Sequence, residues 1–480
     1  MNILFATSEA RPLIKTGGLA DVSGALPAAL REIGIDCRLL LPGYPAVLAG
    51  VDAAKPVCSL SGLPGGNVAT LLEAAMPDNG VPLYILDAPE LFEREGGPYQ
   101  DVAGHDHPDN ALRFAVFSKA AALLASTELS ADYSINSPLA WRPDLLHCND
   151  WQTGLAPAYL RLAGQTTPSV MTVHNLAYQG IFPPADMATV ELPPESFGVE
   201  GVEYYGNLSF LKAGLYYANR LTTVSPSYAE EIRRPALGMG MQGLLSTRGG
   251  DLVGILNGID TGEWNPSSDL YLAYEYSVRA LSGKKRCKLK LQQDLNLEPG
   301  KDTPLFGVIA RLAQQKGLDL ILAVATGILH RGGQIALLGT GEKVLEAAFR
   351  DLGARHPGRV AAVIGYDEGL AHRIEAGADI FLMPSRFEPC GLNQLYSLRY
   401  GTVPVVHATG GLKDTVDDGV TGFVFHEPTA HALWLAVDRA LHAYADAKTW
   451  QRMMRAGMNR DFSWEKNARE YAALYRGVLG

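Results

Sequence analysis

The chain has 480 residues, 47% of them hydrophobic and 19% charged, a composition typical of a globular protein with two or three domains. Its formal net charge of −10 disfavours a nucleic acid or an anionic membrane as partner, because neither attracts an acidic protein. The start lacks the basic segment of a signal peptide, no apolar run approaches membrane-spanning length, and the five cysteines form no C-x-x-C pair. We therefore expect a cytoplasmic protein without disulfides or structural zinc.

The N-terminal segment predicts a β–α–β unit. A buried strand is expected over residues 3–7, a helix over 18–33 and a second strand over 36–41. The intervening turn carries KTGGL at 15–19 in place of G-x-G-x-x-G, and no acidic residue closes the second strand, which disfavours a dinucleotide fold for hydride transfer. A lysine beside paired glycines at a helix start can bind a phosphate, although an isolated Lys15 would more often be a surface residue.

Residues 104–110 (GHDHPDN) have the composition of a metal site, but no helix supplies i, i+4 spacing, so we favour a polar loop without metal. The next stretch, residues 109–126, predicts an amphipathic helix. Its apolar face comprises Leu112, Val116, Ala120 and Leu123.

Polar residues follow two further predicted strands, at 143–148 and 169–173. Asn149 and Asp150 come after the first strand, and His174 comes after the second. Because the carboxyl ends of parallel strands share one edge of a sheet, we expect these side chains at one rim. A lone histidine is usually structural, but His174 at a strand end near Asp150 is a better candidate for a functional site.

The domain boundary is expected soon after residues 238–243, which match G-x-G-x-x-G but follow Arg-Arg-Pro and not a strand, so that the context of a dinucleotide site is missing. We predict an N-terminal domain over residues 1–243, a linker over 244–254 and a C-terminal domain over 255–457. The last stretch, from 450 to 480, predicts helices.

Strands are predicted in the second half at residues 305–310, 334–338 and 360–364. The first of them is followed by Arg311 and, at a helix start, by Lys316. Two cations around one turn suit a diphosphate, and the plainer alternative is a pair of surface charges.

The stretch from 378 to 411 predicts two strand–turn–helix units in succession. A buried strand over 378–383 leads to a turn containing Glu388 and a helix over 392–400; a strand over 403–407 leads to the turn Thr409-Gly410-Gly411. Helix starts at strand carboxyl ends favour anions, so the two turns together predict a cradle for a phosphorylated ligand. The alternative is that the glycines only satisfy turn geometry.

Six segments occur in the order of a known family. They are residues 15–19 (KTGGL), 147–151 (HCNDW), 172–180 (TVHNLAYQG), 257–260 (NGID), 311–317 (RLAQQKG) and 384–392 (PSRFEPCGL). Over nearly its whole length the chain thereby resembles bacterial glycogen synthases and plant starch synthases. The resemblance implies the GT-B fold, an α/β architecture of two doubly wound Rossmann-like domains facing across a deep cleft, with a C-terminal helix over 458–480 that joins the N-terminal domain. It also implies retaining transfer of glucose from ADP-glucose to the non-reducing end of an α-1,4-glucan, without a metal or cofactor.

The resemblance assigns roles to individual residues. The catalytic candidates are Glu388, His174 and Asp150. The candidates for binding ADP-glucose are Lys15, Gly17, Gly18, Asp21, Asn257, Arg311, Lys316, Tyr366, Cys390, Gly391, Leu392, Thr409, Gly410 and Gly411. Tyr99 is the candidate for stacking on an acceptor sugar, and Tyr366 for stacking on the nucleobase.

Within this scheme the cations and the Gly391-Leu392 helix start face the diphosphate, and Glu388 bears on the positive charge that develops on the sugar. We expect front-face attack by the acceptor hydroxyl, with the leaving phosphate as base. Related transferases often carry E-x7-E, but here the second position is Tyr396, so the residue that binds the ribose is unassigned. Because Lys15 and Arg311 come from different predicted domains, we also expect the enzyme to close on its substrate.

Three alternatives stay open at this point. The chain could use UDP-glucose or a small acceptor, or it could be a sugar-nucleotide sensor without turnover. A dehydrogenase is disfavoured by the missing glycine fingerprint. The sequence does not indicate the oligomeric state.

Overall fold

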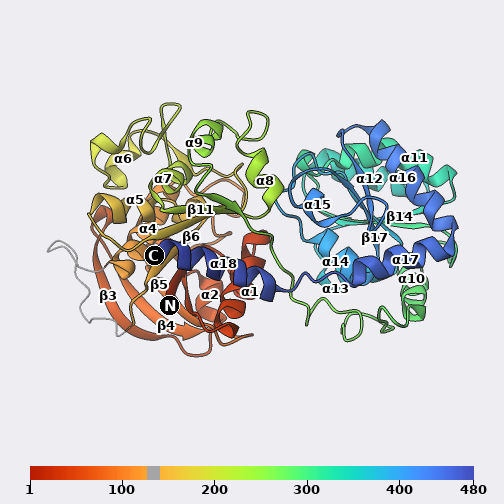
Figure 1. Ribbon diagram of the computed structural model, residues 1–480, viewed down its shortest axis with the longest axis horizontal. Coiled ribbons are helices and arrows are strands. Elements are labelled where there is room, and N and C mark those ends of the chain that lie inside the picture. Colours follow the sequence, from red (N-terminus) through yellow and green to blue (C-terminus); the bar gives the residue numbers. More distant parts are fainter. Residues whose placement is uncertain (127–140) are drawn as a thin grey trace. The chain divides into compact units, whose positions relative to one another are not determined.

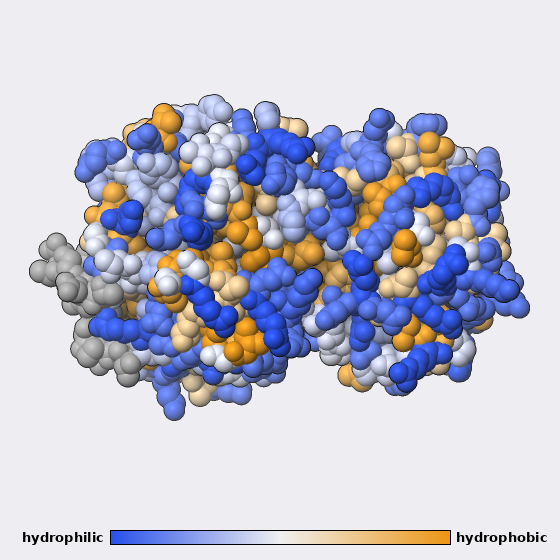
Figure 2. Space-filling model, viewed as in Figure 1, coloured by the Kyte–Doolittle hydropathy of each residue, from blue (hydrophilic) through white to orange (hydrophobic). Residues whose placement is uncertain are grey.

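The computed structural model describes residues 1–126 and 141–480, which fold into two compact units (Figure 1). The first unit comprises Met1–Val224, Ala229–Ile255 and Trp464–Gly480, and the second comprises Ser225–Tyr228 and Leu256–Ser463. Both are α/β units built on a largely or wholly parallel sheet, as the sequence predicts. Hydrophilic residues cover much of the face of each unit drawn in Figure 2. Within the described residues, the helices are all too short or too polar to cross a bilayer.

The first unit contains a nine-stranded sheet of order β12-β11-β7-β6-β1-β2-β5-β4-β3. Its strands are β1 (Asn2–Ala6), β2 (Asp36–Pro42), β3 (Lys55–Leu63), β4 (Asn67–Ala75), β5 (Pro82–Asp87), β6 (Leu145–Asn149), β7 (Ser169–Val173), β11 (Arg220–Thr223) and β12 (Leu252–Gly254). Pairing is parallel from β12 to β5 and antiparallel between β5, β4 and β3. The central strands β6 and β7 are buried at every position, because helices cover both faces of a parallel sheet. A small sheet of β8 (Ile181–Phe182), β10 (Asn207–Ser209) and β9 (Glu203–Tyr204) lies outside the main one.

The helices of the first unit are α1 (Gly18–Glu32), α2 (Pro45–Ala49), α3 (Pro89–Phe92), α4 (Asn110–Ala125), α5 (Leu155–Leu162), α6 (Asp186–Thr189), α7 (Phe210–Tyr217), α9 (Gln242–Thr247) and α18 (Trp464–Leu479), and α8 (Pro226–Glu231) spans the division between the units. The C-terminal helix α18 packs within the first unit, where the hydroxyl of Tyr475 lies 2.7 Å from Nδ1 of His147 on β6.

Helix α4 is buried almost all round, and not along one stripe as the sequence predicts: Leu112 is its one residue outside the buried class. This burial includes the cation Arg113, whose guanidinium donates to the carbonyls of Leu91 and Pro98 and to the side chain of Asn110. These three bonds offset much of the cost of burying the charge, although one guanidinium nitrogen has no hydrogen-bond partner among the described residues.

The second unit contains a six-stranded, wholly parallel sheet of order β15-β14-β13-β16-β17-β18. Its strands are β13 (Leu305–Ile309), β14 (Gln334–Gly339), β15 (Val360–Ile364), β16 (Ile380–Met383), β17 (Val403–His407) and β18 (Phe423–Phe425). Its helices are α10 (Ser282–Asp294), α11 (Leu318–His330), α12 (Lys343–Arg355), α13 (Glu368–Gly377), α14 (Asn393–Tyr400), α15 (Gly410–Thr415), α16 (Ala430–Ala445) and α17 (Ala447–Met458).

Both sheets have a topological switch point. In the first unit the chain passes from β1 to β2 on one side, and the later strand β6 pairs on the other side of β1. In the second unit β14 and β16 flank β13 in the same way. In open α/β sheets a ligand binds at the carboxyl ends of the strands at such a point. The loops after β1, β6, β13 and β16 are therefore the places to look for a site.

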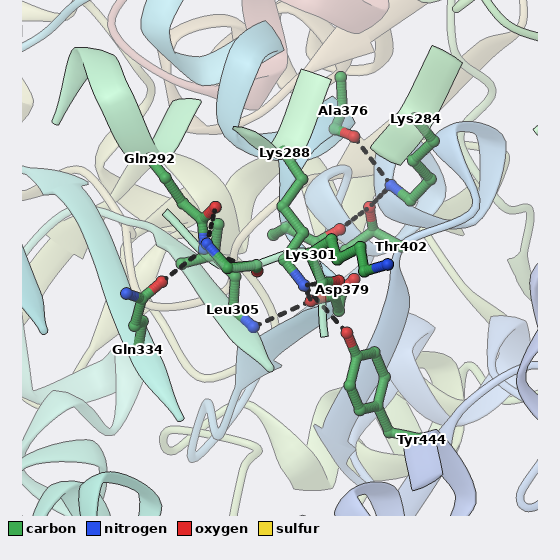
Figure 3. Close-up of polar contacts among 12 residues, drawn as sticks. Lys284, Lys288, Gln292, Lys301, Leu305, Gln334, Ala376, Asp379, Thr402 and Tyr444 are labelled. Carbon is green, nitrogen blue, oxygen red and sulfur yellow. Dashed lines mark hydrogen bonds and ion pairs between the residues drawn. The ribbon is translucent and has the colours of Figure 1, made fainter. Parts of the chain in front are cut away.

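Helix α10 is anchored to the start of the second sheet by a buried polar network (Figure 3). The ammonium of Lys288 lies 2.6 Å from Asp379 and donates to Tyr444. Asp379 also accepts the backbone N–H of Leu305, the first residue of β13. One turn away, Lys284 donates to the hydroxyl of Thr402. The network fixes α10 against β13, β16 and β17 through charged groups that are largely buried.

The stretch 244–254, predicted as a linker, contains the end of α9 and the strand β12, which pairs in parallel with β11. Contacts place this stretch in the first unit and the change of unit at Ile255–Leu256. Its residues belong to an apolar run that continues through Leu256, but nothing in the run itself indicates that it pairs with β11 in the first unit.

Candidate active site

The loop after β1 is organised by Glu9, a carboxylate that is 2% exposed. One of its oxygens accepts the backbone N–H groups of Thr16 and Gly17 at 2.5 and 3.2 Å. The other accepts the hydroxyls of Thr16 and Tyr99 at 2.6 and 2.5 Å. Three of these four hydrogen bonds hold the KTGG segment against the carboxyl end of β1, just ahead of α1, and the fourth comes from Tyr99.

The glycines of this segment leave space beside the backbone. A methyl group placed on Gly17 or Gly18 would meet no atom within 4 Å, and both residues are exposed. The ammonium of the preceding Lys15 lies 2.7 Å from the carboxylate of Asp21 in α1, so these two predicted ligand-binding residues are paired with each other. A backbone without side chains beside an exposed cation is accessible to an anionic ligand.

Tyr99 lies under this loop. Its ring packs against those of Phe114 and Trp151, and its hydroxyl bonds Glu9 and Ser8. This packing favours support of the Glu9 carboxylate over the predicted stacking on an acceptor sugar.

We expect Glu9→Gln to lower the free energy of unfolding of the first unit by about 1–3 kcal/mol, because an amide presents N–H groups to donors that now meet a carboxylate. Thermal or urea unfolding of the variant would measure this loss. The control Glu32→Gln removes an exposed carboxylate of the same unit and should change stability by less than about 0.5 kcal/mol. Equal stabilities for the two variants would contradict the role given to Glu9.

The loops after β6 and β7 bring Asp150, His174 and Asn149 together, as the sequence predicts. The backbone N–H of His174 donates to Asp150 at 2.7 Å, and its Nε2 lies 3.0 Å from Oδ1 of Asn149. Asp150 has φ +55°, a strained conformation for a residue with a side chain, and such strain clusters at functional sites. Burial lowers the pKa of His174 to about 3, so the ring is a neutral hydrogen-bonding group at neutral pH.

Burial raises the pKa of Asp150 to about 7, although the backbone N–H groups of His174 and Asn175 partly oppose the shift. Between pH 4 and 7 the folded state therefore holds a proton that the unfolded chain, with a pKa near 3.8, releases. The stability of the wild type should therefore fall as pH rises through this window. Asp150→Asn has no carboxyl group to titrate at this position, so its stability should not fall for this reason. We expect the melting temperature of the variant, relative to wild type, to be higher at pH 8 than at pH 5. A difference that is independent of pH would contradict the shifted pKa.

The second unit brings Glu388 and Lys316 together from the loops after β16 and β13. The Lys316 ammonium lies 2.6 Å from Oε2 of Glu388, which also accepts the hydroxyl of Ser385 at 2.9 Å. The Glu388 side chain is 8% exposed and that of Lys316 is 23% exposed. A carboxylate and a cation thus meet at the switch point of this sheet, with the cation partly open to solvent.

Gln315 connects the same two loops. Its amide donates to the carbonyl of Phe387 at 3.1 Å, and its backbone carbonyl accepts the N–H of Arg386. Arg311, the other predicted cation, lies on the same loop, with its guanidinium 3.4 Å from the Gln315 side chain. The residue is exposed, so Arg311 is accessible to a ligand at the edge where Lys316 and Glu388 meet.

The two glycine-containing turns of this unit are in direct contact. A Cβ on Gly410, which has φ +44°, would lie 2.0 Å from the carbonyl oxygen of Glu388, and one on Gly411 would lie 2.1 Å from that of Cys390. The N–H of Gly411 donates to the carbonyl of Glu388 at 3.2 Å. Only glycine permits this approach, so Gly410 and Gly411 hold the Glu388 loop in place. The sequence TGG at 409–411 is the same as at 16–18. Gly410 and Gly411 are packed against other backbone, whereas Gly17 and Gly18 have no atom near their Cβ positions.

The remaining predicted residues surround this pair of turns. Gly391 has φ +73° and precedes Leu392, the residue before the first turn of α14. The backbone N–H of Asn257 bonds the sulfur of Cys390, whose pKa burial raises to about 12, so this thiol is no nucleophile at neutral pH. The side-chain oxygen of Asn257 is buried and, among the described residues, has no hydrogen-bond partner. Thr409 is 2% exposed and serves as the N-cap position of α15.

Two tyrosines lie at different places near this site. Tyr366 follows β15 and is 77% exposed, with its hydroxyl bonded to Glu368. Tyr396, in the second position of E-x7-E, stacks on Trp264 with ring centroids 3.6 Å apart. The aromatic substitution thus belongs to a packed stack, which explains why a glutamate is absent there.

The residues that sequence reasoning missed are Glu9, Ser385 and Gln315. Glu9 follows β1 by three residues, so the rule that identified Asp150 after β6 applied to it as well. Ser385 and Gln315 stand inside segments that the family pattern covers, but only their contacts with the Glu388 loop indicate their roles.

Comparisons with known proteins agree with this arrangement. Residues 2–247 match the family model of the starch synthase catalytic domain, and residues 292–459 match that of glycosyl transferases group 1. The glycogen synthase of Nitrosospira multiformis is 51% identical and that of Aromatoleum aromaticum 53% identical, each over at least 99% of this chain and at least 96% of the relative. The starch synthase IV catalytic domain of Arabidopsis thaliana, solved with ADP and acarbose, superposes with a TM-score of 0.88 at 30% identity, covering 100% of this chain and 99% of that one.

The first unit carries the starch synthase match and the second the match to glycosyl transferases group 1. The chain has the two Rossmann-like domains of GT-B transferases. It belongs to the glycogen and starch synthase family and is a glucosyl-transferring glycosyltransferase.

Proposed function

We propose that this enzyme transfers glucose from ADP-glucose to the non-reducing end of an α-1,4-glucan, with retention of configuration, in glycogen synthesis. The observation that carries the proposal is the Lys316–Glu388 pair at the switch point of the second sheet, 2.6 Å between charged atoms. Cleavage of a glycosyl diphosphate leaves negative charge on the phosphate and positive charge on the sugar. A cation and a carboxylate side by side match both charges.

The diphosphate of the donor is assigned to the cations and the helix start of the second unit. Lys316 and the exposed Arg311 would pair with its oxygens, and the N–H groups at Gly391-Leu392 ahead of α14 would donate to it. Phosphate at Lys316 would compete with Glu388 for the ammonium. That competition releases the carboxylate toward the sugar when the donor binds, a change that the proposal requires.

The base of the donor is assigned to Tyr366, whose ring is exposed directly after β15. ADP in the structure of the Arabidopsis relative supports an adenine nucleotide here. The second position of the E-x7-E motif, which would bind the ribose, is Tyr396, and its ring stacks on Trp264. We assign it no side chain.

The glucose is assigned to Glu388 and, from the first unit, to His174 and Asp150. A neutral His174 can donate or accept a hydrogen bond to a sugar hydroxyl without adding charge. The exposed Gly17, Gly18 and Lys15 form an open anion-accepting segment in the same unit. A phosphate at Lys15 would displace Asp21 from its ion pair.

Retention follows from the acceptor hydroxyl attacking the face that the diphosphate leaves. Retaining hydrolases use two carboxylates, one of them as the nucleophile. Among the described residues the second position of the E-x7-E motif is Tyr396, so the motif supplies no second carboxylate beside Glu388. The leaving phosphate then takes the proton of the acceptor hydroxyl. Cys390 is excluded as nucleophile by its raised pKa and burial.

Transfer of radiolabelled glucose to glycogen tests the proposal, with ADP-glucose and UDP-glucose compared in parallel without added metal. We expect strong incorporation from ADP-glucose. A glucosidase that cleaves α-1,4 linkages and not β linkages should then release the label from the product. Incorporation from UDP-glucose alone would overturn the nucleotide assignment. Tight nucleotide binding without transfer from either donor would indicate a sensor.

A further inference from the structure

Three side chains of the second unit form a cluster that the transfer reaction does not use. Glu263 lies in the segment after Asn257, and Glu368 and His372 lie one turn apart on α13. One ligand atom from each, two carboxylate oxygens and a nitrogen of the imidazole, lie within 4.8 Å of one another. Nε2 of His372 lies 3.9 Å from a carboxylate oxygen of Glu368.

His372 is fully buried, yet one of its nitrogens has no hydrogen bond. Its Nδ1 lies 2.8 Å from Asp269, a carboxylate that also accepts the N–H of Tyr271 and the hydroxyl of Tyr400. Because a carboxylate accepts and does not donate, Nδ1 carries the proton. Nε2 is buried and finds no hydrogen-bond partner in the described part of the chain, and it lies on the side of Glu368, whose carboxylate belongs to the same cluster as Glu263. A buried acceptor without a donor is costly and calls for a ligand.

The orientation of the ring is fixed from both sides. Trp264 stacks on His372 with centroids 3.7 Å apart and an angle of 13° between the planes, and Tyr396 stacks on the other face of Trp264. Tyr271 packs against the His372 ring as well. The imidazole therefore cannot turn Nε2 toward another partner without breaking the stack. A histidine held by a carboxylate at one nitrogen and aimed by packing at the other is the arrangement of metal-ligating histidines.

We propose that His372 Nε2, Glu263 and Glu368 bind a divalent transition-metal ion of the Zn²⁺ type, oriented by Asp269. One imidazole and two carboxylates suit Zn²⁺, Co²⁺ or Mn²⁺, whereas Mg²⁺ and Ca²⁺ prefer oxygen ligands alone. In tetrahedral coordination, ligand atoms about 2.1 Å from one ion lie about 3.4 Å apart, so ligand atoms that now lie within 4.8 Å of one another would move inward by about an ångström. Both glutamates are partly exposed, and the Tyr366 hydroxyl already bonds one oxygen of Glu368.

The site joins two segments that are far apart in the sequence, because Glu263 lies before α10 and Glu368 begins α13. It does not contain the residues assigned to transfer, and no step of the reaction passes through it. The alternative without metal is a protonated His372 whose Nε2–H makes a loose ion pair with Glu368 at 3.9 Å. The two differ in one respect: the ion pair gives no specific binding of a transition metal.

The test is titration of the chelator-treated full-length enzyme with Co²⁺, followed by its visible absorption and then by displacement with Zn²⁺. We expect one Co²⁺ to bind per chain, with the visible absorption bands of four- or five-coordinate Co²⁺. Zn²⁺ should displace the bound Co²⁺, and Mg²⁺ at the same concentration should not. Glu263→Gln and Glu368→Gln should each weaken binding at least about tenfold, the loss that even an outer partner of a metal site produces. Neither side chain is fully buried, so both variants should fold.

His442→Gln is the matched control, because His442 also lies beside a carboxylate, Asp438, but on the exposed face of α16. Its Co²⁺ affinity should equal that of wild type. The proposal is overturned if the wild-type enzyme shows no saturable Co²⁺ band, if Glu263→Gln and Glu368→Gln bind as tightly as wild type, or if Mg²⁺ displaces Co²⁺ equally well.

Discussion

Replacing Glu388 by glutamine is expected to lower kcat for glucosyl transfer by about 10²–10³-fold, the loss that follows removal of one preorganised electrostatic group from a transition state. The carboxylate is 8% exposed, 2.6 Å from Lys316 and 2.9 Å from Ser385, so it is held in its loop until donor phosphate takes up Lys316 and releases it toward the sugar. Glutamine keeps the shape and can still accept from Ser385, but it supplies no charge to the sugar. Binding of ADP should change little or tighten, because Lys316 loses a competing anion. Steady-state kinetics and ADP titration would separate these two effects.

Asp319→Asn provides the matched control for this experiment. Asp319 pairs with Arg386, two residues before Glu388, at 2.7 Å, and the pair is exposed. The variant removes one carboxylate from the same loop region but none from the predicted site, so kcat should stay within a few-fold of wild type. If Asp319→Asn and Glu388→Gln lose activity equally, the effect belongs to loop stability and the role proposed for Glu388 is wrong.

The fold was largely predictable because its signals are local. The strands found at β1, β7, β13 and β17 are short apolar runs bounded by glycine, proline or polar residues, and the predicted ranges differ from the observed ones by at most one residue at either end. Where an element's place depends on a distant partner the prediction differed. The three-residue β12 lay inside the predicted linker although its residues are apolar, because its place in the first unit depends on parallel pairing with β11.

The site was predictable as a set of loops and less so as a set of contacts. Strand ends and family motifs indicated Glu388, Lys316, Asp150 and His174, and the structure brings the first two and the last two together. Sequence could not tell that Gly410 and Gly411 pack on the Glu388 loop while Gly17 and Gly18 face open space. The same four letters, TGGL, serve different purposes because their neighbours come from distant segments.

Glu9 is a second residue whose role depends on contacts with segments distant in the sequence. Its position after β1 could have indicated this glutamate, but its importance arises from four donors that reach it from residues 16, 17 and 99. The role of Tyr99 changes with it, from a sugar contact predicted from its residue type to a support for the carboxylate. Long-range polar contacts of this kind are set by the whole fold.

The second large effect is expected from Lys288→Ala, which should lower the free energy of unfolding of the second unit by about 3–5 kcal/mol, because it leaves a buried carboxylate without its cation. The Lys288 side chain is 3% exposed and that of Asp379 13% exposed, with 2.6 Å between their charged atoms (Figure 3). Removal of the ammonium also takes a donor from Tyr444 and from the carbonyl of Lys301. Asp379 keeps the N–H of Leu305 and its hydrogen bond with Tyr444, neither of which supplies the lost positive charge.

Hydrogen exchange in β13 and β16 is the appropriate measurement, because a chain of two units need not unfold in one step. Lys290→Ala is the control on the same helix: its pair with Asp294 is exposed, so we expect a change within about 0.5 kcal/mol. The double variant Lys288→Met with Asp379→Asn removes both charges and should recover part of the loss, since an uncharged buried pair carries no desolvation cost of this size. Equal protection of β13 in Lys288→Ala and Lys290→Ala would show that the buried pair does not hold α10 on the sheet.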